Sequence, residues 1–351
     1  MTAPIPVAVL GATGSVGQRF ISLLHEHPWF KVVALAASDR SAGLPFAQAC
    51  HWTLSDPMPA WATEMTVQPV ALESVKDARI LFSALPSNLA ADLEPRFAQA
   101  GFAVCSNAAS HRRDPEVPLL LPEVNPDHIL LIHQQRKERG WGGCILTNPN
   151  CTSTGLTVAL KALHDAFGIQ RAFVVSLQAL SGAGYPGVPS LDITDNIIPY
   201  IAGEEDKVEW EPRKILGKFN ANGIELSVIR LSAHTNRVPV TDGHTLCVSV
   251  ECSQPVTPEA AIQVLDTYQP PAAVRGLPST PKPVIVVYPE NNRPQPRLDR
   301  MIGGGMSTIV GRLRPDPLLH IKFVVLSHNT IRGAAGGSIY NAELLVKENL
   351  L

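Results

Sequence analysis

The stretch VAVLGATGSVGQRFISLLH, residues 7–25, decides the fold class of the chain. Its apolar start predicts a short buried strand, Gly11, Gly14 and Gly17 predict a tight turn, and the run after them predicts an amphipathic helix. In this context, glycines let the backbone approach a dinucleotide pyrophosphate that lies on the helix N-terminus. The GxxGxxG spacing also fits a glycine-rich turn that binds no ligand, so the rest of the chain must decide.

The first 150 residues continue the alternation of strands and helices. A helix is predicted over residues 89–100, residues 45–75 are irregular, and further strands are predicted over residues 31–37, 78–86, 102–106 and 144–147. This order predicts a doubly wound parallel sheet, an α/β fold of the Rossmann type. We expect a dinucleotide-binding domain over residues 1–150, completed by the C-terminal segment 330–351.

The pattern changes after residue 150, where long strand-like runs outnumber helices. The clearest runs are residues 171–180, 225–231, 245–251, 284–288 and 319–326. They predict a second domain of the α+β class, with a mixed or antiparallel sheet, over residues 151–329. The proline-rich residues 270–296 read as a loop inside it, and the glycine-rich residues 333–338 lead into a terminal helix over 339–350.

Composition narrows the class of protein. A net charge of −2 over 351 residues gives no reason to expect nucleic acid or an anionic membrane as a partner. No apolar run approaches the length of a membrane span, and the N-terminus has no signal-peptide pattern. The six cysteines fit reduced thiols, and without a CxxC motif or a His/Cys cluster no metal site is expected. We therefore expect a cytoplasmic location.

A cysteine occupies the predicted start of a helix in NPNCTSTG, residues 148–155. Helix-capping residues surround Cys151, and the positive end of a helix dipole lowers a thiol pKa, which favours the nucleophilic thiolate. Backbone N–H groups at this place can also hold an oxyanion. The alternative is a buried structural cysteine, which is common among free cysteines.

A nucleotide domain followed by such a cysteine suggests covalent aldehyde chemistry, with a thiohemiacetal and a thioester on the sulfur. This chemistry needs a base, and His244, at a turn that enters a strand, is the best candidate among 11 histidines.

The segment SDRS (residues 38–41), at the end of the second predicted strand, indicates which cofactor binds. Asp39 suits the ribose hydroxyls of NAD and Arg40 a 2′-phosphate, and the flanking serines favour NADP.

Taken together, these motifs resemble the aspartate-semialdehyde dehydrogenase family, in its archaeal and fungal branch. The resemblance covers nearly the whole chain and rests on GATGSVG (11–17), SDRSAG (38–43), SNAASHRRDPEVPLLLPEVN (106–125), TNPNCTSTG (147–155), LQALSGAGYPG (177–187), AGEEDK (202–207), RVPVTDGH (237–244) and SHNTIRGAAGGS (327–338).

The resemblance implies roles for individual side chains. Cys151 falls on the nucleophile, His244 on the general acid/base, and Gln178 on the amide that orients the thioester. Substrate positions are implied for Arg237 (carboxylate), Glu204 (amine, with Glu205 as rival), Lys207 and Arg112 (phosphate, with Arg113 as rival), and Asn150. Positions for NADP are implied for Gly11, Thr13, Gly14, Ser15, Val16, Gly17, Ser38, Arg40, Ser41, Ser83, Ala84, Ser181, Gly182 and Asn329.

The implied activity is the reversible, phosphate-dependent oxidation of L-aspartate 4-semialdehyde to 4-phospho-L-aspartate, run reductively in amino-acid biosynthesis by a homodimer or homotetramer. An acyl-CoA reductase that acts on malonyl-CoA is the nearest alternative, since it would use the same cysteine and histidine. A short-chain dehydrogenase is disfavoured because no tyrosine has a lysine four residues later. A binding protein without catalysis is disfavoured by the complete set Cys151, Gln178, Arg237 and His244.

Overall fold

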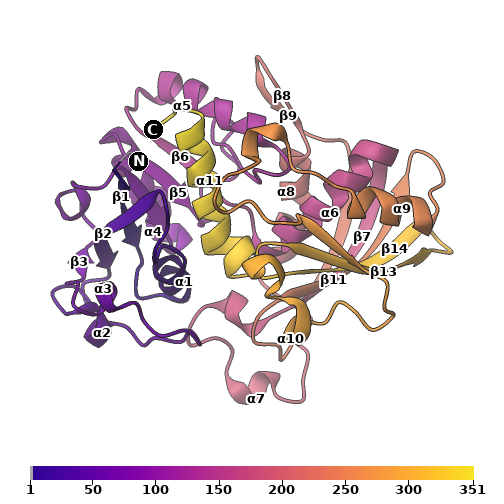
Figure 1. Cartoon of the computed structure of the whole chain (residues 1–351), viewed down its shortest axis with the longest axis horizontal. Coiled ribbons are helices and arrows are strands. Elements are labelled where there is room, and N and C mark those ends of the chain that lie inside the picture. Colours follow the sequence, from indigo (N-terminus) through magenta and orange to yellow (C-terminus); the bar gives the residue numbers. More distant parts are fainter. Residues whose placement is uncertain (1–2) are drawn as a thin grey trace.

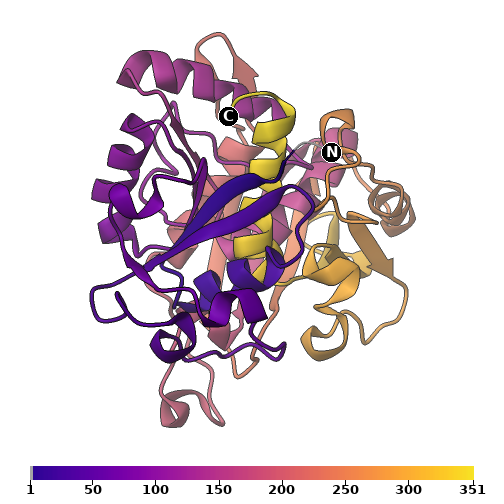
Figure 2. The ribbon, with the colours of Figure 1, turned by 60° about the vertical axis from the view of Figure 1, so that its left-hand side comes forward.

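The computed structural model describes residues 3–351, which form two six-stranded sheets with the C-terminal helix α11 (Gly336–Lys347) between them (Figure 1). The two sheets occupy separate blocks of the chain, and the indigo-to-magenta half of the ribbon holds the first sheet. The view turned by 60° shows α11 beside the strands of this sheet (Figure 2). The last helix therefore returns to the first part of the chain.

The first sheet is parallel throughout, in the order β3-β2-β1-β4-β5-β6. Its strands are β1 (Ile5–Leu10), β2 (Phe30–Ala37), β3 (Gln68–Pro69), β4 (Ile80–Ser83), β5 (Ala103–Ser106) and β6 (Cys144–Thr147). The order runs outward from β1 in both directions, so a crevice opens beyond the carboxyl ends of β1 and β4. Ligands of open α/β sheets bind at such a switch point.

Helices cover both faces of the parallel sheet because apolar residues point to both sides of its strands. On one face, α1 (Ser15–Leu23) and α11 share a core with Val7, Val9 and Phe82. On the other, α4 (Ser87–Gln99) packs on the alternate strand residues. The remaining helices of this half are α2 (Phe46–Ala49), α3 (Ala60–Thr63) and α5 (Leu131–Arg139).

The second sheet is mixed, in the order β10-β7-β11-β14-β13-β12. Its strands are β7 (Ile169–Gln178), β10 (Arg230–Arg237), β11 (His244–Cys252), β12 (Ile285–Tyr288), β13 (Thr308–Pro315) and β14 (Ile321–Ser327). One face packs on α6 (Cys151–Phe167), α8 (Glu204–Ile215) and α9 (Pro258–Asp266) through alternate apolar residues. The opposite face carries the exposed Phe173 and Cys247.

Two expectations about the chain after residue 150 were wrong, and one strand was missed. Residues 225–231 are not one strand, because the chain leaves the hairpin of β8 (Lys218–Asn220) and β9 (Gly223–Glu225) and only then enters β10. The strand β13 was missed, since its two arginines mask an apolar start. Residues 333–338 are helical, because a π-helical turn (Ile331–Ala335) runs directly into α11 and tertiary packing outweighs the low helix propensity of glycine.

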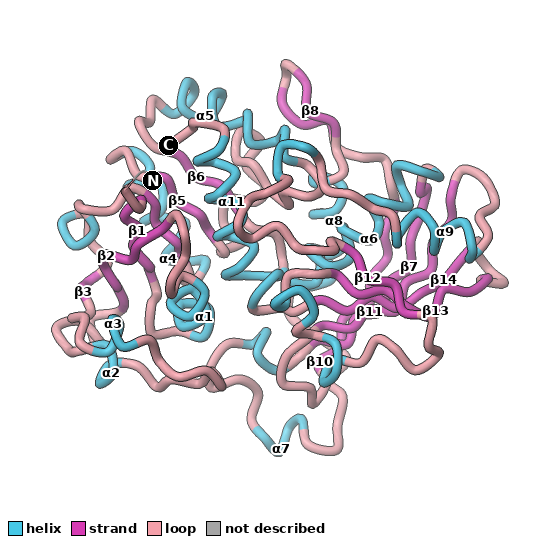
Figure 3. The backbone as a smooth tube through the Cα atoms, viewed as in Figure 1, coloured by secondary structure: helices cyan, strands magenta, loops and turns pink. Residues whose placement is uncertain are grey.

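Loops make up most of residues 179–203, which surround the short α7 (Ser190–Ile193) and project beyond the sheets (Figure 3). A second short helix, α10 (Pro296–Asp299), precedes β13. No helix within residues 3–351 is long and apolar enough to cross a membrane. The described chain also contains no cluster of His, Cys, Asp or Glu side chains that could hold a metal ion, and its six cysteines are free thiols.

Candidate active site

Cys151 is the first residue of α6, as the capping pattern predicted. The strand β6 ends at Thr147, and Asn150 is the N-cap of the helix. The Asn150 Oδ1 atom accepts hydrogen bonds from the N–H groups of Thr152 (2.9 Å) and Ser153 (3.2 Å). The cap therefore takes up two of the first N–H groups of the helix and leaves the N–H of Cys151 beside the sulfur.

Three further candidate residues lie at the ends of neighbouring strands. Gln178 ends β7 and is paired in register with Arg237, the last residue of the parallel β10. His244 begins the antiparallel β11, on the other side of β7. Since adjacent strands are about 4.8 Å apart, this order fixes the three side chains beside one another. All three are buried, with exposed fractions of 1% for Gln178, 6% for Arg237 and 0% for His244.

The imidazole of His244 contacts the cysteine. Its Nε2 atom lies 3.1 Å from Sγ of Cys151. Its Nδ1 atom accepts a hydrogen bond from the N–H of Ala179 at 3.0 Å, so the proton of the neutral ring belongs on Nε2 and faces the sulfur. Burial, with smaller contributions from Arg237 and His328, lowers the pKa of His244 to about 3. The histidine is therefore a neutral hydrogen-bond donor toward the sulfur.

The thiol pKa differs from the prediction. Burial, and then the Glu204 carboxylate, raises the pKa of Cys151 to about 12, while Arg112, Arg237 and Lys207 act in the opposite direction. The predicted lowering was wrong, because loss of hydration outweighs the effect of the helix terminus. Cations around the thiol are therefore needed to favour the thiolate.

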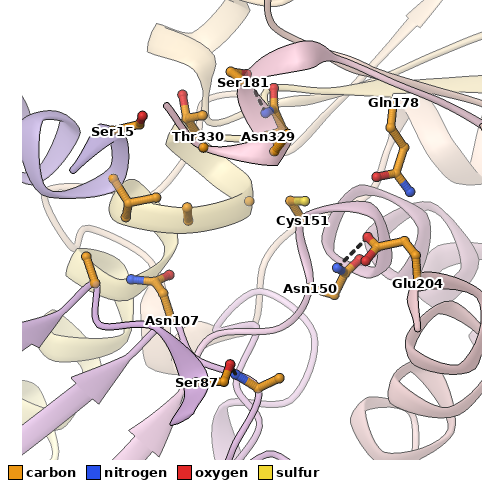
Figure 4. Close-up of a pocket in the computed structure, with 18 of the residues that line it drawn as sticks. Ser15, Ser87, Asn107, Asn150, Cys151, Gln178, Ser181, Glu204, Asn329 and Thr330 are labelled. Carbon is orange, nitrogen blue, oxygen red and sulfur yellow. Dashed lines mark hydrogen bonds between the residues drawn. The ribbon is translucent and has the colours of Figure 1, made fainter. Parts of the chain in front are cut away.

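The residues predicted for substrate line one cavity of about 800 Å³, together with Cys151 and Gln178 (Figure 4). Glu204 accepts a hydrogen bond from Nδ2 of Asn150 at 2.6 Å and one from Nζ of Lys207 at 3.1 Å. Arg237 donates to the carbonyl oxygen of Ala179 at 2.6 Å. Arg112 lines the same cavity. Three cations and one carboxylate thus face the space above the sulfur, which suits an anion that also carries an ammonium group.

The two rival residues that the sequence left open, Glu205 and Arg113, do not line the cavity. Glu205 accepts a hydrogen bond from the N–H of Thr235 at 3.1 Å, outside the lining of the cavity. Arg113 pairs with the exposed Asp206 at 2.6 Å and lies 4.4 Å from the ring of Trp210. Glu204 and Arg112 are therefore the members of each pair that face the cavity.

The cofactor residues are divided between the cavity and its surroundings. The cavity is lined by Gly14, Ser15, Val16, Ala84, Ser181, Gly182 and Asn329. Gly11 and Gly17 lie under the turn, where a Cβ atom on Gly17 would come 2.3 Å from the Gly11 oxygen. Thr13 lies in the turn itself, Ser38, Arg40 and Ser41 lie at an open turn after β2, and Ser83 is fully buried in β4.

The glycine turn fits a dinucleotide. Gly14 is the N-cap of α1 and supplies no side-chain hydrogen bond, so the first N–H groups of this helix face the cavity without a protein cap. Gly11 has a φ of +74°, and a Cβ atom there would lie 2.6 Å from the carbonyl oxygen of Ala84. Uncapped N–H groups and a turn that admits no side chain form a site for a pyrophosphate.

Comparison with known proteins agrees with this geometry. Family models for semialdehyde dehydrogenases match residues 6–132 (NAD binding domain) and residues 160–332 (dimerisation domain). The chain is 53% identical over 345 residues to the aspartate-semialdehyde dehydrogenase of Archaeoglobus fulgidus, with 98% of this chain and 99% of that protein covered. The chain belongs to the aspartate-semialdehyde dehydrogenase family.

Other members of the aspartate-semialdehyde dehydrogenase family extend the match. The enzyme of Schizosaccharomyces pombe is 49% identical, with 98% of this chain and 99% of that protein covered. The crystal structure of the Candida albicans aspartate-semialdehyde dehydrogenase with NADP superposes with a TM-score of 0.91 at 44% identity, over 99% of this chain and 100% of that one. The fold predicted from the sequence, a Rossmann-type domain plus a domain with a mixed sheet, is confirmed.

Sequence reasoning missed several residues of this aspartate-semialdehyde dehydrogenase family site. Ser87, Asn107, Thr330 and Gly333 line the cavity, but loop residues of these types carry no signal in a single sequence. It also missed the buried Glu211 and Lys214, which do not line the cavity. Their spacing from Glu204 and Lys207 (seven residues each) places all four on the same helix face, but this spacing does not show that Glu211 and Lys214 are buried.

Proposed function

We propose that the protein is an NADP-dependent, phosphorylating aspartate-semialdehyde dehydrogenase, which in biosynthesis reduces 4-phospho-L-aspartate to L-aspartate 4-semialdehyde. The observation that carries this proposal is the 3.1 Å contact of Cys151 with His244 under a cavity that holds Arg237, Glu204 and Arg112. The membership of the family supports the activity, and the charges of the cavity support the substrate.

Each charged group of the substrate has a complementary residue in the cavity. Arg237 would bind the α-carboxylate with its planar fork of donors. Glu204 would bind the ammonium group, held in place by Asn150 and Lys207. Lys207 and Arg112 would bind the phosphate. Malonyl-CoA has no ammonium group for Glu204, so the cavity supports the semialdehyde over this alternative.

The chemistry takes place on the sulfur of Cys151. The thiolate, favoured by Arg112, Arg237 and Lys207, attacks the carbonyl carbon of the acyl phosphate, and phosphate leaves with the C–O bonding pair to form a thioester. A reduced nicotinamide held in the cofactor crevice would supply the hydride for reduction of this thioester. The thiohemiacetal oxyanion on Cys151 then collapses to the aldehyde, and the thiolate takes back the C–S bonding pair.

His244 and the start of α6 would stabilise the oxyanions of both steps. One forms when the thiolate attacks the acyl phosphate, and the other forms when the thioester is reduced. The neutral ring presents its Nε2–H group toward the sulfur, where an oxyanion forms, and the N–H of Cys151 lies beside it. Gln178, buried at the end of β7, would orient the thioester. A general acid/base role for His244 remains the prediction from the sequence, while the hydrogen bond from Ala179 supports a donor role.

NADP would occupy the crevice at the switch point of the first sheet. Gly11, Gly14 and Gly17 would cradle the pyrophosphate against α1, and Arg40 with Ser38 and Ser41 would bind the 2′-phosphate. Thr13, Val16 and Ser83 remain predicted neighbours of the cofactor. Ser181, Gly182 and Asn329 would enclose the nicotinamide, since Asn329 donates to Oγ of Ser181 at 2.7 Å and accepts from the N–H of Gly243 at 2.8 Å.

We propose the domain organisation that the sequence predicted, which the separation of the two sheets supports. We place the cofactor domain at residues 1–150 plus 330–351, and the catalytic domain at 151–329. The protein is an oligomer through its dimerisation domain. We propose a homodimer, or a tetramer built from it, that buries the open face of the mixed sheet around Phe173. The cytoplasm, predicted from the sequence, is the proposed location.

One assay tests the activity. NADPH formation is measured with L-aspartate semialdehyde in the presence and absence of inorganic phosphate, beside NADPH consumption with malonyl-CoA. We expect turnover of the semialdehyde that requires phosphate, and none of malonyl-CoA. Turnover of malonyl-CoA alone would overturn the substrate but keep the cysteine mechanism. Cys151→Ala should abolish all turnover.

A further inference from the structure

Glu211 is a buried carboxylate that bridges two parts of the site without lining the cavity. Its side chain is 2% exposed. Its Oε1 atom accepts a hydrogen bond from Nη1 of Arg112 at 2.8 Å. Its Oε2 atom accepts a hydrogen bond from the backbone N–H of Asn150 at 2.7 Å. One carboxylate thus joins the arginine that faces the cavity to the residue just before the nucleophile.

The protein binds two of the three nitrogen atoms of the Arg112 guanidinium and, within residues 3–351, leaves the third without a partner. Its Nη2 atom donates to the carbonyl oxygen of Asn107 at 2.8 Å, which together with Glu211 fixes the plane of the group. Its Nε atom is buried and has no partner among the described residues. An orphaned donor of a buried cation is costly unless a ligand completes it.

Lys214 fixes the backbone that carries this arginine. The Lys214 Nζ atom donates to the carbonyl oxygens of Arg112, Asp114 and Val117, each at 2.8 Å. Glu211 and Lys214 are three residues apart and lie on the same face of α8 as Glu204 and Lys207. One helix face therefore supplies both the groups that touch the substrate space and the groups that hold Arg112 behind it.

We propose that Glu211 is a positioning residue, which aims Arg112 at the substrate phosphate and at the same time fixes the backbone at Asn150, so that the phosphate and the sulfur of Cys151 are held in register. This inference rests on the proposed function, because it assigns the anion at Arg112 as the phosphate of that reaction. The register matters because small displacements of reacting groups are costly in rate.

The two contacts require a carboxylate. Both partners of Glu211 are donors, an N–H of Arg112 and an N–H of Asn150, so both side-chain oxygens must accept. Glutamine would turn an amide NH₂ group toward one of these donors and lose that contact. Aspartate keeps two accepting oxygens on a shorter side chain. Comparison of Glu211→Gln with Glu211→Asp thus distinguishes the loss of an accepting oxygen from a change in side-chain size.

A matched control lies five residues away on the same helix. Asp206 pairs with Arg113, the neighbour of Arg112, but both side chains are exposed, at 72% and 54%. Asp206→Asn removes a carboxylate–arginine pair from the same helix and the same loop without touching the cavity. Exposed ion pairs contribute little, so this variant should retain the parental constants within about twofold.

The test combines kinetics with a binding measurement that needs no turnover. Wild type, Glu211→Gln, Glu211→Asp and Asp206→Asn are compared for kcat, for KM of phosphate and NADP, and for binding of inorganic phosphate by titration calorimetry. Loss of one charge-assisted hydrogen bond predicts a roughly tenfold higher phosphate KM and Kd for Glu211→Gln, with the KM of NADP unchanged. Glu211→Asp should fall between this variant and wild type.

A double-mutant cycle shows whether Glu211 acts through Arg112. In an Arg112→Ala background, Glu211→Gln should produce no further loss of phosphate binding, because the group that it positions is gone. Additive losses, or equal effects on the KM values of phosphate and NADP, would show a general structural role and overturn the proposal. If Glu211→Gln does not fold, the same cycle with Glu211→Asp decides. Absence of phosphate-dependent turnover in wild type would instead refute the proposed function, while calorimetry still tests the bridge.

Discussion

Gly333 lies directly against Cys151, and a Cβ atom on the glycine would come 2.7 Å from the Cβ atom of the cysteine. This contact joins the π-helical turn before α11 to the first turn of α6. Asn148 donates to the carbonyl oxygen of Gly333 at 3.1 Å, and the buried Arg332 is paired with Glu123 at 2.7 Å. The segment beside the nucleophile is therefore fixed on both sides.

Gly333→Ala should displace Cys151 from its position at the start of α6. A methyl group at this contact cannot fit without a shift of the start of α6, and overpacking of this kind costs about 1–3 kcal/mol. We expect kcat to fall roughly 10- to 100-fold, measured by steady-state kinetics, because displacement by about 1 Å can cost a hundredfold in rate. Gly142→Ala is the control, since its nearest neighbour would lie 3.6 Å away. Equal activity of both variants would contradict the tight contact.

His244 should remain a neutral Nε2–H ring over the working pH range. The hydrogen bond from Ala179 occupies Nδ1, and burial lowers the pKa to about 3, so protonation requires acid. Nitrogen NMR of histidine-labelled protein, with His244→Gln to assign the signal, should show the Nε2–H tautomer without titration between pH 8 and pH 5. A signal typical of an imidazolium at neutral pH would point instead to an ion pair with Cys151.

Acid should destabilise the protein through its buried neutral histidines. Burial lowers the pKa values of His128 and His328 to about 4, and that of His244 to about 3. Below pH 6.5 the unfolded chain binds protons that the folded chain excludes, so the free energy of unfolding falls as the pH falls toward 4 and is unaffected above 6.5. Each histidine contributes a loss of about 3 kcal/mol by pH 4.

Urea unfolding at several pH values measures this effect. The hydrogen bonds of His128 do not involve Cys151, because its ring contacts Asn125 and the carbonyl oxygen of Gly217. His128→Gln should reduce the fall in unfolding free energy between pH 6 and pH 4 by about 2 kcal/mol, with little effect on kcat at pH 8. An unchanged slope would show that His128 is already protonated in the folded protein.

Arg40→Ala should weaken the binding of NADP more than the binding of NAD. Arg40 lies at the exposed turn after β2. In doubly wound folds, this turn binds the 2′ position of the cofactor ribose. Loss of a charge-assisted contact with the 2′-phosphate should raise the KM of NADP roughly tenfold and change that of NAD about twofold or less. Arg40→Lys should restore part of the preference because it keeps the charge. Parallel changes in both KM values would place the 2′-phosphate elsewhere.

Most strands of the first sheet and the place of Cys151 at a helix start were predictable because their signals are local. The strand over 144–147 is an apolar run between a glycine turn and a proline, and Cys151 follows a capping residue. His244 was chosen because it lies at a turn that enters a strand, while only the resemblance to the family implied roles for Gln178 and Arg237. The neighbouring strands β7, β10 and β11 explain why these distant residues meet.

Other features could not be predicted, since they depend on tertiary contacts. Glu211 and Lys214 look like solvated helix residues in the sequence, yet they are buried around Arg112. The pKa of Cys151 depends on burial, which a capping pattern does not report. The glycines over 333–338 look like a loop, but close packing on Cys151, Asn148 and Met306 leaves no room for side chains in this helical segment.

The return of α11 to the first sheet has a consequence for biosynthesis of the protein itself. The chain reaches Cys151 before its midpoint, but Asn329, Thr330 and Gly333, which enclose the cavity, come just before the final helix. A growing chain on the ribosome therefore carries the nucleophile for most of its synthesis without the segment that closes around it. The cavity is completed only when residues 329–333 emerge, so a chain that ended before them would lack this part of the site.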